Sequence, residues 1–174
     1  MIIIEGPDNS GKSILAKHLS QSLKLKIWHS PGPNTKEQLY DSMDFVMKQE
    51  ELILDRVPCI SEQIYGPVLR GKNLLQDTGL LEKLIEEKDP IFIYCRPSTD
   101  IIVSKKMKFR LEESEDHKRK VVEEIYTLIT IYDTCMQGVP HILYDWPWVS
   151  PMYFDLLVQH CKTYLIWRRD RERR

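Results

Sequence analysis

The residues best suited to chemistry lie near the start of the chain, at positions 6–13, which read GPDNSGKS. This run matches the phosphate-binding pattern G-x-x-x-x-G-K-[ST] at every fixed position, between an apolar stretch and a run of helix formers. Glycines let backbone N–H groups turn toward phosphate oxygens, and the N-terminus of the following helix adds a positive dipole. The run therefore predicts a nucleotide-phosphate site, and we expect its ligand to be ATP.

Lys12 and Ser13 carry the side-chain chemistry of such a loop. The lysine reaches the β- and γ-phosphates, and the serine hydroxyl is a ligand of Mg²⁺. We expect seven residues in and beside the loop to bind ATP: Gly6, Asn9, Ser10, Gly11, Lys12, Ser13 and Ile14.

A second magnesium ligand is needed at the end of a neighbouring parallel strand. The run Leu52–Asp55 provides it, because three apolar residues that indicate a buried strand are followed by an acid. We predict that Ser13 and Asp55 hold Mg²⁺, partly through water.

The rest of the chain supplies the elements that position these groups. Short apolar runs rich in Ile, Val and Tyr alternate with longer amphipathic stretches, which is typical of an α/β fold. We predict a three-layer sandwich, a five-stranded parallel sheet with helices on both faces. The predicted strands are Met1–Glu5, Lys26–Ser30, Leu52–Asp55, Ile91–Cys95 and His141–Tyr144. The predicted helices are Lys12–Leu23, Thr35–Gln49, Ser61–Leu69, Thr78–Lys88, Ser98–Lys108, His117–Met136 and Pro151–Tyr164.

Length and charge limit the number of domains and the kinds of partner. With 174 residues, 42% of them hydrophobic and 29% charged, the chain suits one compact domain. We predict a single domain over residues 1–167 and a solvated basic tail at 168–174, which holds five arginines and two acids. The net charge of −1 does not favour nucleic acid as a partner, so we expect small-molecule nucleotides instead.

The cysteines and the apolar runs indicate a cellular setting. Four cysteines lie far apart with no Cys-x-x-Cys pair, which predicts reduced thiols in a cytoplasmic protein. No apolar stretch approaches the roughly 20 residues of a transmembrane helix, so we expect no membrane span.

The residues around the loop resemble the nucleoside monophosphate kinases, and within them the thymidylate kinase-like branch. The run Glu5–Asp8 looks like the E-G-x-D start of that branch. Asp55 and Arg56, followed by Ser61 and Tyr65, are similar to its D-R-x-x-x-S-x-x-x-Y pattern, with one residue more before the serine. The resemblance covers nearly the whole chain and implies the P-loop kinase fold and a homodimer.

The resemblance also implies contacts to the phosphate acceptor. Asp8 would touch a deoxyribose 3′-hydroxyl or metal-bound water, and Arg56 would clamp the acceptor phosphate, which a planar guanidinium binds bidentately. The further candidate substrate contacts are Trp28, Ser61, Glu62, Tyr65 and Arg70.

A lid is expected at residues 105–120, where seven basic residues flank four acids. Such a segment excludes water and neutralises charge during phosphoryl transfer. Arg110 and Arg119 are candidate catalytic residues there, beside Lys12 and Arg56. A solvated charged surface is the alternative explanation of the same run.

The phosphate loop predicts an ATP- and Mg²⁺-dependent enzyme, and the resemblance implies a kinase that converts a deoxynucleoside monophosphate, dTMP or a related or modified pyrimidine, to its diphosphate. Thymidylate kinases read thymine with an arginine that precedes this position, whereas no arginine precedes Arg56, so the acceptor base stays open. Two alternatives also stay open. One is a kinase acting on a hydroxyl of a nucleoside or of a modified base in DNA, with Asp8 as general base, and the other is a nucleotide-binding regulator.

Overall fold

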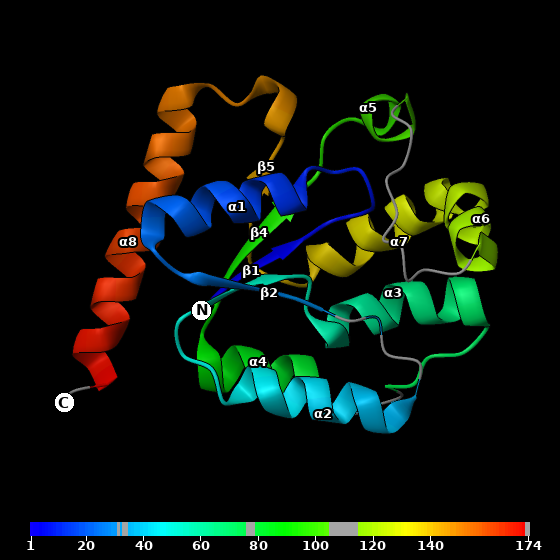
Figure 1. The fold of residues 1–174 in the computed structure, drawn as a ribbon, viewed down its shortest axis with the longest axis horizontal. Coiled ribbons are helices and arrows are strands. Elements are labelled where there is room, and N and C mark those ends of the chain that lie inside the picture. The colour runs from blue at the N-terminus through cyan, green and yellow to red at the C-terminus, as the bar shows by residue number, and fades with distance from the viewer. Residues whose placement is uncertain (31, 33–34, 76–78, 105–114, 173–174) are drawn as a thin grey trace.

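The computed structural model describes residues 1–30, 32, 35–75, 79–104 and 115–172 of the chain (Figure 1). The strands are β1 (Ile2–Glu5), β2 (Lys26–His29), β3 (Leu52–Asp55), β4 (Ile91–Cys95) and β5 (Ile142–Tyr144). The helices are α1 (Lys12–Leu23), α2 (Lys36–Met47), α3 (Pro58–Arg70), α4 (Leu80–Lys88), α5 (Thr99–Ser104), α6 (Glu115–Glu123), α7 (Ile125–Gln137) and α8 (Pro151–Glu172), with a 3₁₀ turn η1 at Trp146–Trp148.

The five strands form one parallel sheet in the order β2-β3-β1-β4-β5. The predicted fold class is confirmed, and so is each of the five predicted strands. Because β1 is central, the segment that follows it leaves the middle of the sheet's carboxyl edge. Ile4 of β1 pairs in register with Asp55 of β3, so the phosphate loop and Asp55 emerge side by side.

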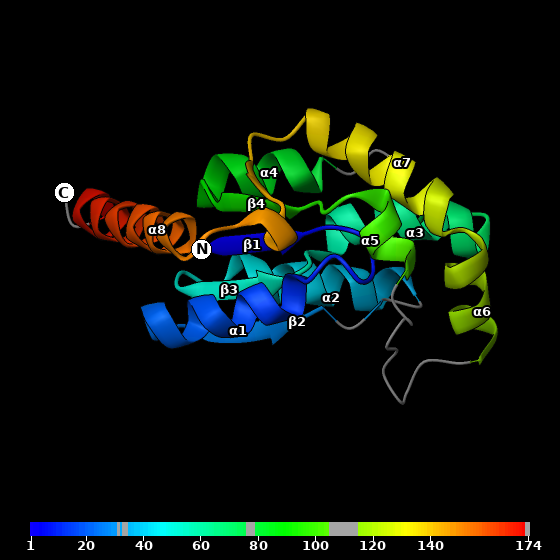
Figure 2. The same cartoon turned by 90° about the horizontal axis from the view of Figure 1, so that it is seen from above.

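The two faces of the sheet bury separate hydrophobic cores. Met1 and Ile3 enter the core formed with α2, α3, α4 and α7, whereas Ile2 and Ile4 enter the core formed with α1 and α8. Figure 2 shows α1 and α7 on opposite sides of β1 and β4. Since side chains alternate along a strand, Glu5 follows Met1 and Ile3 to the α3 and α7 face.

One predicted helix is two helices in the structure. The prediction of a single helix over His117–Met136 is wrong, because α6 and α7 meet at Glu124, whose φ of −99° and ψ of 12° depart from helical values. Hydrogen bonds continue on both sides, from Glu124 N to Lys120 O and from Leu128 N to Glu124 O, each at 2.9 Å. The break is therefore a bend between two helical segments.

Residues 168–172, predicted to be a solvated tail, are the last turns of α8, and Arg169–Arg171 are exposed there. Arg168 donates to Glu50 Oε2 at 2.7 Å, and Arg169 forms an ion pair with Glu51. Both acids lie directly before β3, so long-range ion pairs hold the end of this helix against the sheet. Residues 173 and 174 lie outside the described residues.

Two further observations concern the cysteines and the helices. All four cysteines are free thiols, three of them buried. Among the helices that the structure describes, none combines the length and the apolar character that crossing a membrane requires.

Candidate active site

The phosphate loop joins β1 to α1 and depends on glycine at two positions. The φ angles of Gly6 and Gly11 are 146° and 89°. A Cβ atom on Gly6 would lie 2.3 Å from the carbonyl oxygen of Cys95, and one on Gly11 would lie 2.8 Å from Cδ1 of Trp146. Only glycine fits both places without strain, so the loop keeps the backbone shape that lets N–H groups face a phosphate.

Lys12, the first residue of α1, is buried against this loop. Its Nζ donates to the carbonyl oxygen of Pro7 at 2.6 Å and to Ser10 Oγ at 3.5 Å. Burial and the nearby charge of Arg56 lower the pKa of Lys12 to about 8. The ammonium group therefore lies directly over the loop that is predicted to hold the nucleotide phosphates.

The two predicted magnesium ligands are in direct contact. Ser13 Oγ donates to Asp55 Oδ2 at 2.7 Å, and Nδ1 of His29, the last residue of β2, lies 2.9 Å from the same oxygen. Burial opposes ionisation of Asp55, but the charge of Lys12 and the Ser13 hydrogen bond outweigh it and lower the pKa.

This donor set fits Mg²⁺. The ion prefers oxygen ligands and is usually held in kinases by one or two protein side chains together with substrate phosphates. One carboxylate and one hydroxyl at the foot of the phosphate loop meet that description. Among the residues that the structure describes, no cluster of three or more His, Cys, Asp or Glu forms an all-protein metal cage.

Arg56, Asp8 and Tyr65 form a closed triangle of hydrogen bonds. Arg56 Nη2 donates to Asp8 Oδ1 at 2.6 Å and to the Tyr65 hydroxyl at 2.7 Å, and that hydroxyl donates to Asp8 Oδ2 at 2.8 Å. The guanidinium carbon lies 4.7 Å from the centre of the Tyr65 ring, so the arginine also stacks on it. Three of the predicted acceptor contacts are thus brought together.

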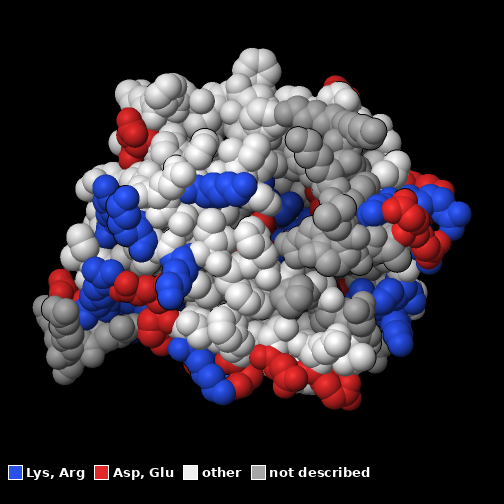
Figure 3. Space-filling model, in the orientation of Figure 1, with Lys and Arg blue, Asp and Glu red and all other residues white. Residues whose placement is uncertain are grey.

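The charges of this triangle are strongly stabilised. Burial would raise the pKa of Asp8, but the charges of Arg56 and Lys12 lower it to about 2. In turn, although burial opposes it, the Asp8 carboxylate raises the pKa of Arg56. Figure 3 shows most charged side chains around the edge of this face and a mixed group of basic and acidic atoms in a hollow near its centre.

Two buried residues behind the triangle carry no role in the sequence analysis. Glu5 Oε1 accepts a hydrogen bond from the backbone N–H of Val57 at 2.6 Å, and Oε2 accepts one from the Tyr132 hydroxyl at 3.3 Å. Burial raises the pKa of Glu5 to about 7. The signals in the sequence are an acid that ends an otherwise apolar strand and the match of Glu5–Asp8 to the E-G-x-D pattern.

Three other predicted substrate contacts lie on α3. Ser61 Oγ is buried and has no hydrogen-bond partner among the described residues. Glu62 is buried, pairs with Arg70 and accepts a hydrogen bond from Leu74 N at 2.8 Å. Glu62 and Arg70 therefore hold the connection after α3, and both Glu62 oxygens are occupied within the protein.

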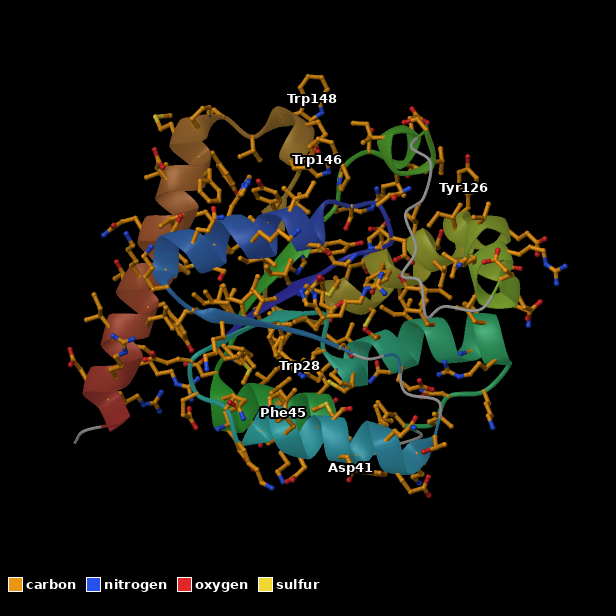
Figure 4. The ribbon with its side chains drawn as sticks, viewed as in Figure 1. Trp28, Asp41, Phe45, Tyr126, Trp146 and Trp148 are labelled. Atoms are coloured by element: carbon orange, nitrogen blue, oxygen red, sulfur yellow. The ribbon has the colours of Figure 1, made fainter. Side chains whose placement is uncertain are left out.

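Trp28 packs on Phe45 of α2, with ring centres 5.5 Å apart (Figure 4). In the predicted lid, Arg110 lies outside the described residues. Arg119 is exposed on α6 and pairs with two acids of its own helix, with Asp116 at 2.6 Å and Glu123 at 3.9 Å. Its catalytic role stays a prediction.

Sequence comparison with known proteins finds a relative that covers most of the chain. No protein-family profile matches this chain. The chain is 24% identical over 155 residues to the SPbeta prophage-derived uncharacterized protein YorR of Bacillus subtilis strain 168, with 84% of this chain and 87% of that protein covered.

Solved structures extend the likeness over nearly the whole chain. The crystal structure of YorR from Bacillus subtilis in complex with phosphorylated GDP has a TM-score of 0.70 at 20% identity and covers 97% of each chain. Deoxyadenosine kinase from M. mycoides, with dCMP and dCDP bound, has a TM-score of 0.63 at 18% identity and covers 94% of this chain and 98% of its own. Shikimate kinase from Acinetobacter baumannii, with shikimate, has a TM-score of 0.54 at 14% identity and covers 96% and 93%. At these identities the likeness concerns architecture, and the architecture of this chain is the P-loop kinase fold.

Proposed function

We propose that this protein transfers the γ-phosphoryl group of ATP, with Mg²⁺, to the 5′-monophosphate of a deoxynucleoside, which yields the diphosphate and ADP. The observation that carries the proposal is the partly buried guanidinium of Arg56, held by Asp8 and Tyr65 beside the phosphate loop. A second cation next to Lys12 suits a reaction that brings two negatively charged phosphates together.

The charges favour a phosphate acceptor over a hydroxyl acceptor. Transfer to a nucleoside hydroxyl is helped by a general base, and Asp8 is the candidate for that role. Its pKa of about 2 and its two hydrogen bonds, to Arg56 and Tyr65, make it a weak proton acceptor. A monophosphate oxygen is already deprotonated near neutral pH, so it needs no base.

Each group at the site then has a defined task. Lys12 neutralises charge on the donor phosphates, while Asp8 and Tyr65 hold Arg56 so that it meets the acceptor phosphate. Ser13 and Asp55 would hold Mg²⁺, which neutralises charge on the phosphates when it is bound. Nε of Arg56 and Oγ of Ser61 are buried and have no hydrogen-bond partner among the described residues.

A coupled ADP-release assay with MgATP tests the proposal across all deoxynucleoside and nucleoside monophosphates and the free deoxynucleosides. We expect the highest kcat/KM for a deoxynucleoside monophosphate. Absence of turnover with every monophosphate would contradict the proposal. Turnover of a nucleoside alone would support the hydroxyl-acceptor alternative, and the structural likeness to a deoxyadenosine kinase is the reason for including nucleosides.

Arg56→Lys tests the acceptor contact itself. Lysine keeps the charge but not the bidentate geometry, so we expect the KM of the monophosphate to rise roughly 10-fold or more while the KM of ATP changes little. Arg96→Lys is the matched control, because Arg96 forms a two-point pair with Asp133 of α7, at 2.7 and 2.9 Å, outside the triangle. An equal effect of both substitutions would argue against a role of Arg56 in acceptor binding.

A further inference from the structure

The turn between β3 and α3 holds Arg56 in an unusual backbone conformation. Its φ angle is 72°, in the left-handed region that residues with side chains rarely adopt. Such a conformation persists only where the surrounding structure fixes it. The position of the guanidinium therefore depends on what holds the peptide groups on either side of Arg56.

Both of those peptide groups are held by the end of β1. The N–H of Arg56 donates to the carbonyl oxygen of Ile4 at 3.0 Å. The N–H of Val57, the next residue, donates to Glu5 Oε1 at 2.6 Å. A backbone carbonyl thus holds one side of the turn, and a side-chain carboxylate holds the other.

The second oxygen of Glu5 connects the turn to the ring system that carries the guanidinium. Oε2 accepts a hydrogen bond from the Tyr132 hydroxyl at 3.3 Å, and the Tyr132 ring meets the Tyr65 ring edge to face, with centres 5.9 Å apart. Tyr65 in turn binds Arg56 through its hydroxyl. Glu5 therefore acts on Arg56 from two directions, through its backbone and through the aromatic ring beneath it.

We propose that Glu5 is a positioning residue, which holds Arg56 in place for the acceptor phosphate by fixing the β3–α3 turn. The inference rests on the proposed function, since that function gives Arg56 its acceptor. Glu5 is completely buried, and both of its oxygens bind protein groups. Burying a carboxylate is costly, so its presence in an otherwise apolar strand is explained by the geometry that it imposes on the turn.

The test compares two substitutions of Glu5 with a control in the other core. Glu5→Leu removes the acceptor for Val57 N–H at similar size, whereas Glu5→Gln keeps an acceptor oxygen. Ile93→Val removes one buried methylene from β4, in the core beneath α1 and α8. Steady-state KM values for the monophosphate and for ATP are measured for each, together with hydrogen exchange of the Val57 and Arg56 amides.

We expect Glu5→Leu to raise the KM of the monophosphate about 10-fold, with little change in the KM of ATP, and to speed exchange at Val57 about 10-fold, as loss of one buried hydrogen bond predicts. In Glu5→Gln, the KM of the monophosphate and the exchange rate at Val57 should both stay near wild type. Ile93→Val should leave both KM values unchanged. If Glu5→Leu does not fold, Tyr132→Phe removes the hydroxyl that binds Oε2 and Tyr65 while Val57 N–H keeps its contact to Oε1, and it should raise the KM of the monophosphate selectively, about 3-fold.

Equal effects on both KM values, equal behaviour of Glu5→Leu and Glu5→Gln, or an unchanged Val57 amide would overturn the proposal. The exchange measurement needs no substrate. If no monophosphate is turned over, the proposed function fails, while fast exchange at Val57 in Glu5→Leu still shows that Glu5 holds the turn.

Discussion

Asp55 contacts two other polar side chains of the candidate site. It ends β3, accepts a hydrogen bond from Ser13 and contacts His29, so one carboxylate links the phosphate loop to the neighbouring strand. Because the contact to Ser13 exists within the protein alone, the two oxygen ligands that Mg²⁺ would need are already preorganised. Preorganised ligands reduce the cost of reaching the transition state.

Asp55→Asn tests this role. The amide removes the negative charge but retains an oxygen at the same place, so kcat should fall about 100-fold, in line with loss of one transition-state electrostatic contact. The assay measures ADP release over a Mg²⁺ titration, and the concentration that gives half-maximal rate should rise. Unchanged kcat and an unchanged Mg²⁺ dependence would contradict the assignment of Asp55.

Glu5 leads to a prediction about stability and pH. Its pKa is raised from the ordinary value of 4.5 to about 7, mainly by burial. Between pH 4.5 and about pH 7, Glu5 is largely deprotonated in the unfolded chain but still protonated in the folded protein. The contribution of Glu5 to the free energy of unfolding therefore falls as pH rises through this range. Glu5→Gln has no proton to release at this position.

As pH rises from 5 to 8, the free energy of unfolding of Glu5→Gln should therefore increase relative to that of wild type, by up to about 3 kcal/mol. Urea unfolding of both proteins across this range measures the difference, in which the other titrating groups largely cancel. A difference that stays constant with pH, or falls, would contradict the raised pKa.

Among the elements, α8 shows how distant parts of the chain support the sheet. Its last turns reach the start of β3 through ion pairs between Arg168 and Glu50 and between Arg169 and Glu51. The two pairs differ in exposure, because the side chain of Arg168 is 12% exposed and that of Arg169 is 50% exposed. Exposed ion pairs contribute little, whereas a buried arginine that also caps a backbone carbonyl contributes more.

Substitutions in α8 should follow that order. Arg168→Ala removes contacts to Glu50 and to the carbonyl oxygen of Lys88, so it should cost about 1–2 kcal/mol of unfolding free energy. Arg169→Ala should cost less than about 1 kcal/mol, and high salt should reduce that cost further. Thermal unfolding at low and high salt measures the loss of unfolding free energy for each variant. A larger loss for Arg169→Ala than for Arg168→Ala would show that exposure does not set the strength of these ion pairs.

At the scale of the whole molecule, the strand order explains why residues far apart in sequence share one site. The carboxyl ends of β1 and β3 are adjacent, so the phosphate loop, Asp55 and Arg56 meet at one edge of the sheet. Ligands of open α/β sheets bind at this edge. The acceptor-side triangle and the predicted magnesium ligands are therefore consequences of the topology as well as of the motif.

Much of this arrangement could be predicted from local sequence. Most of the strands are short apolar runs, and the phosphate loop is a contiguous motif, so both are visible without knowledge of long-range contacts. The structure brings Ser13 and Asp55 into contact, and the metal site that they would share stays a prediction. The fully buried Glu5 shows what local sequence does not contain, because its partner Val57 is 52 residues away.

The contacts of charged side chains are what the sequence did not predict. An arginine-rich end of a chain has the composition of a solvated tail, and only the fold brings Glu50 and Glu51 to it across 118 residues. Likewise, Glu62 and Arg70 have the types expected of substrate contacts, and the structure pairs them with each other, while their contact to substrate stays a prediction. Charge type was thus predictable, whereas the partner of each charge required the tertiary structure.

The most direct test of the account is a competition between the two classes of acceptor. Purified protein is incubated with MgATP and an equimolar mixture of a deoxynucleoside and its 5′-monophosphate, for each base in turn, and the products are separated and identified by mass. We expect the diphosphate of at least one base to accumulate with ADP while the free deoxynucleoside is unchanged. Accumulation of monophosphate from the deoxynucleoside, with no diphosphate formed for any base, would contradict it.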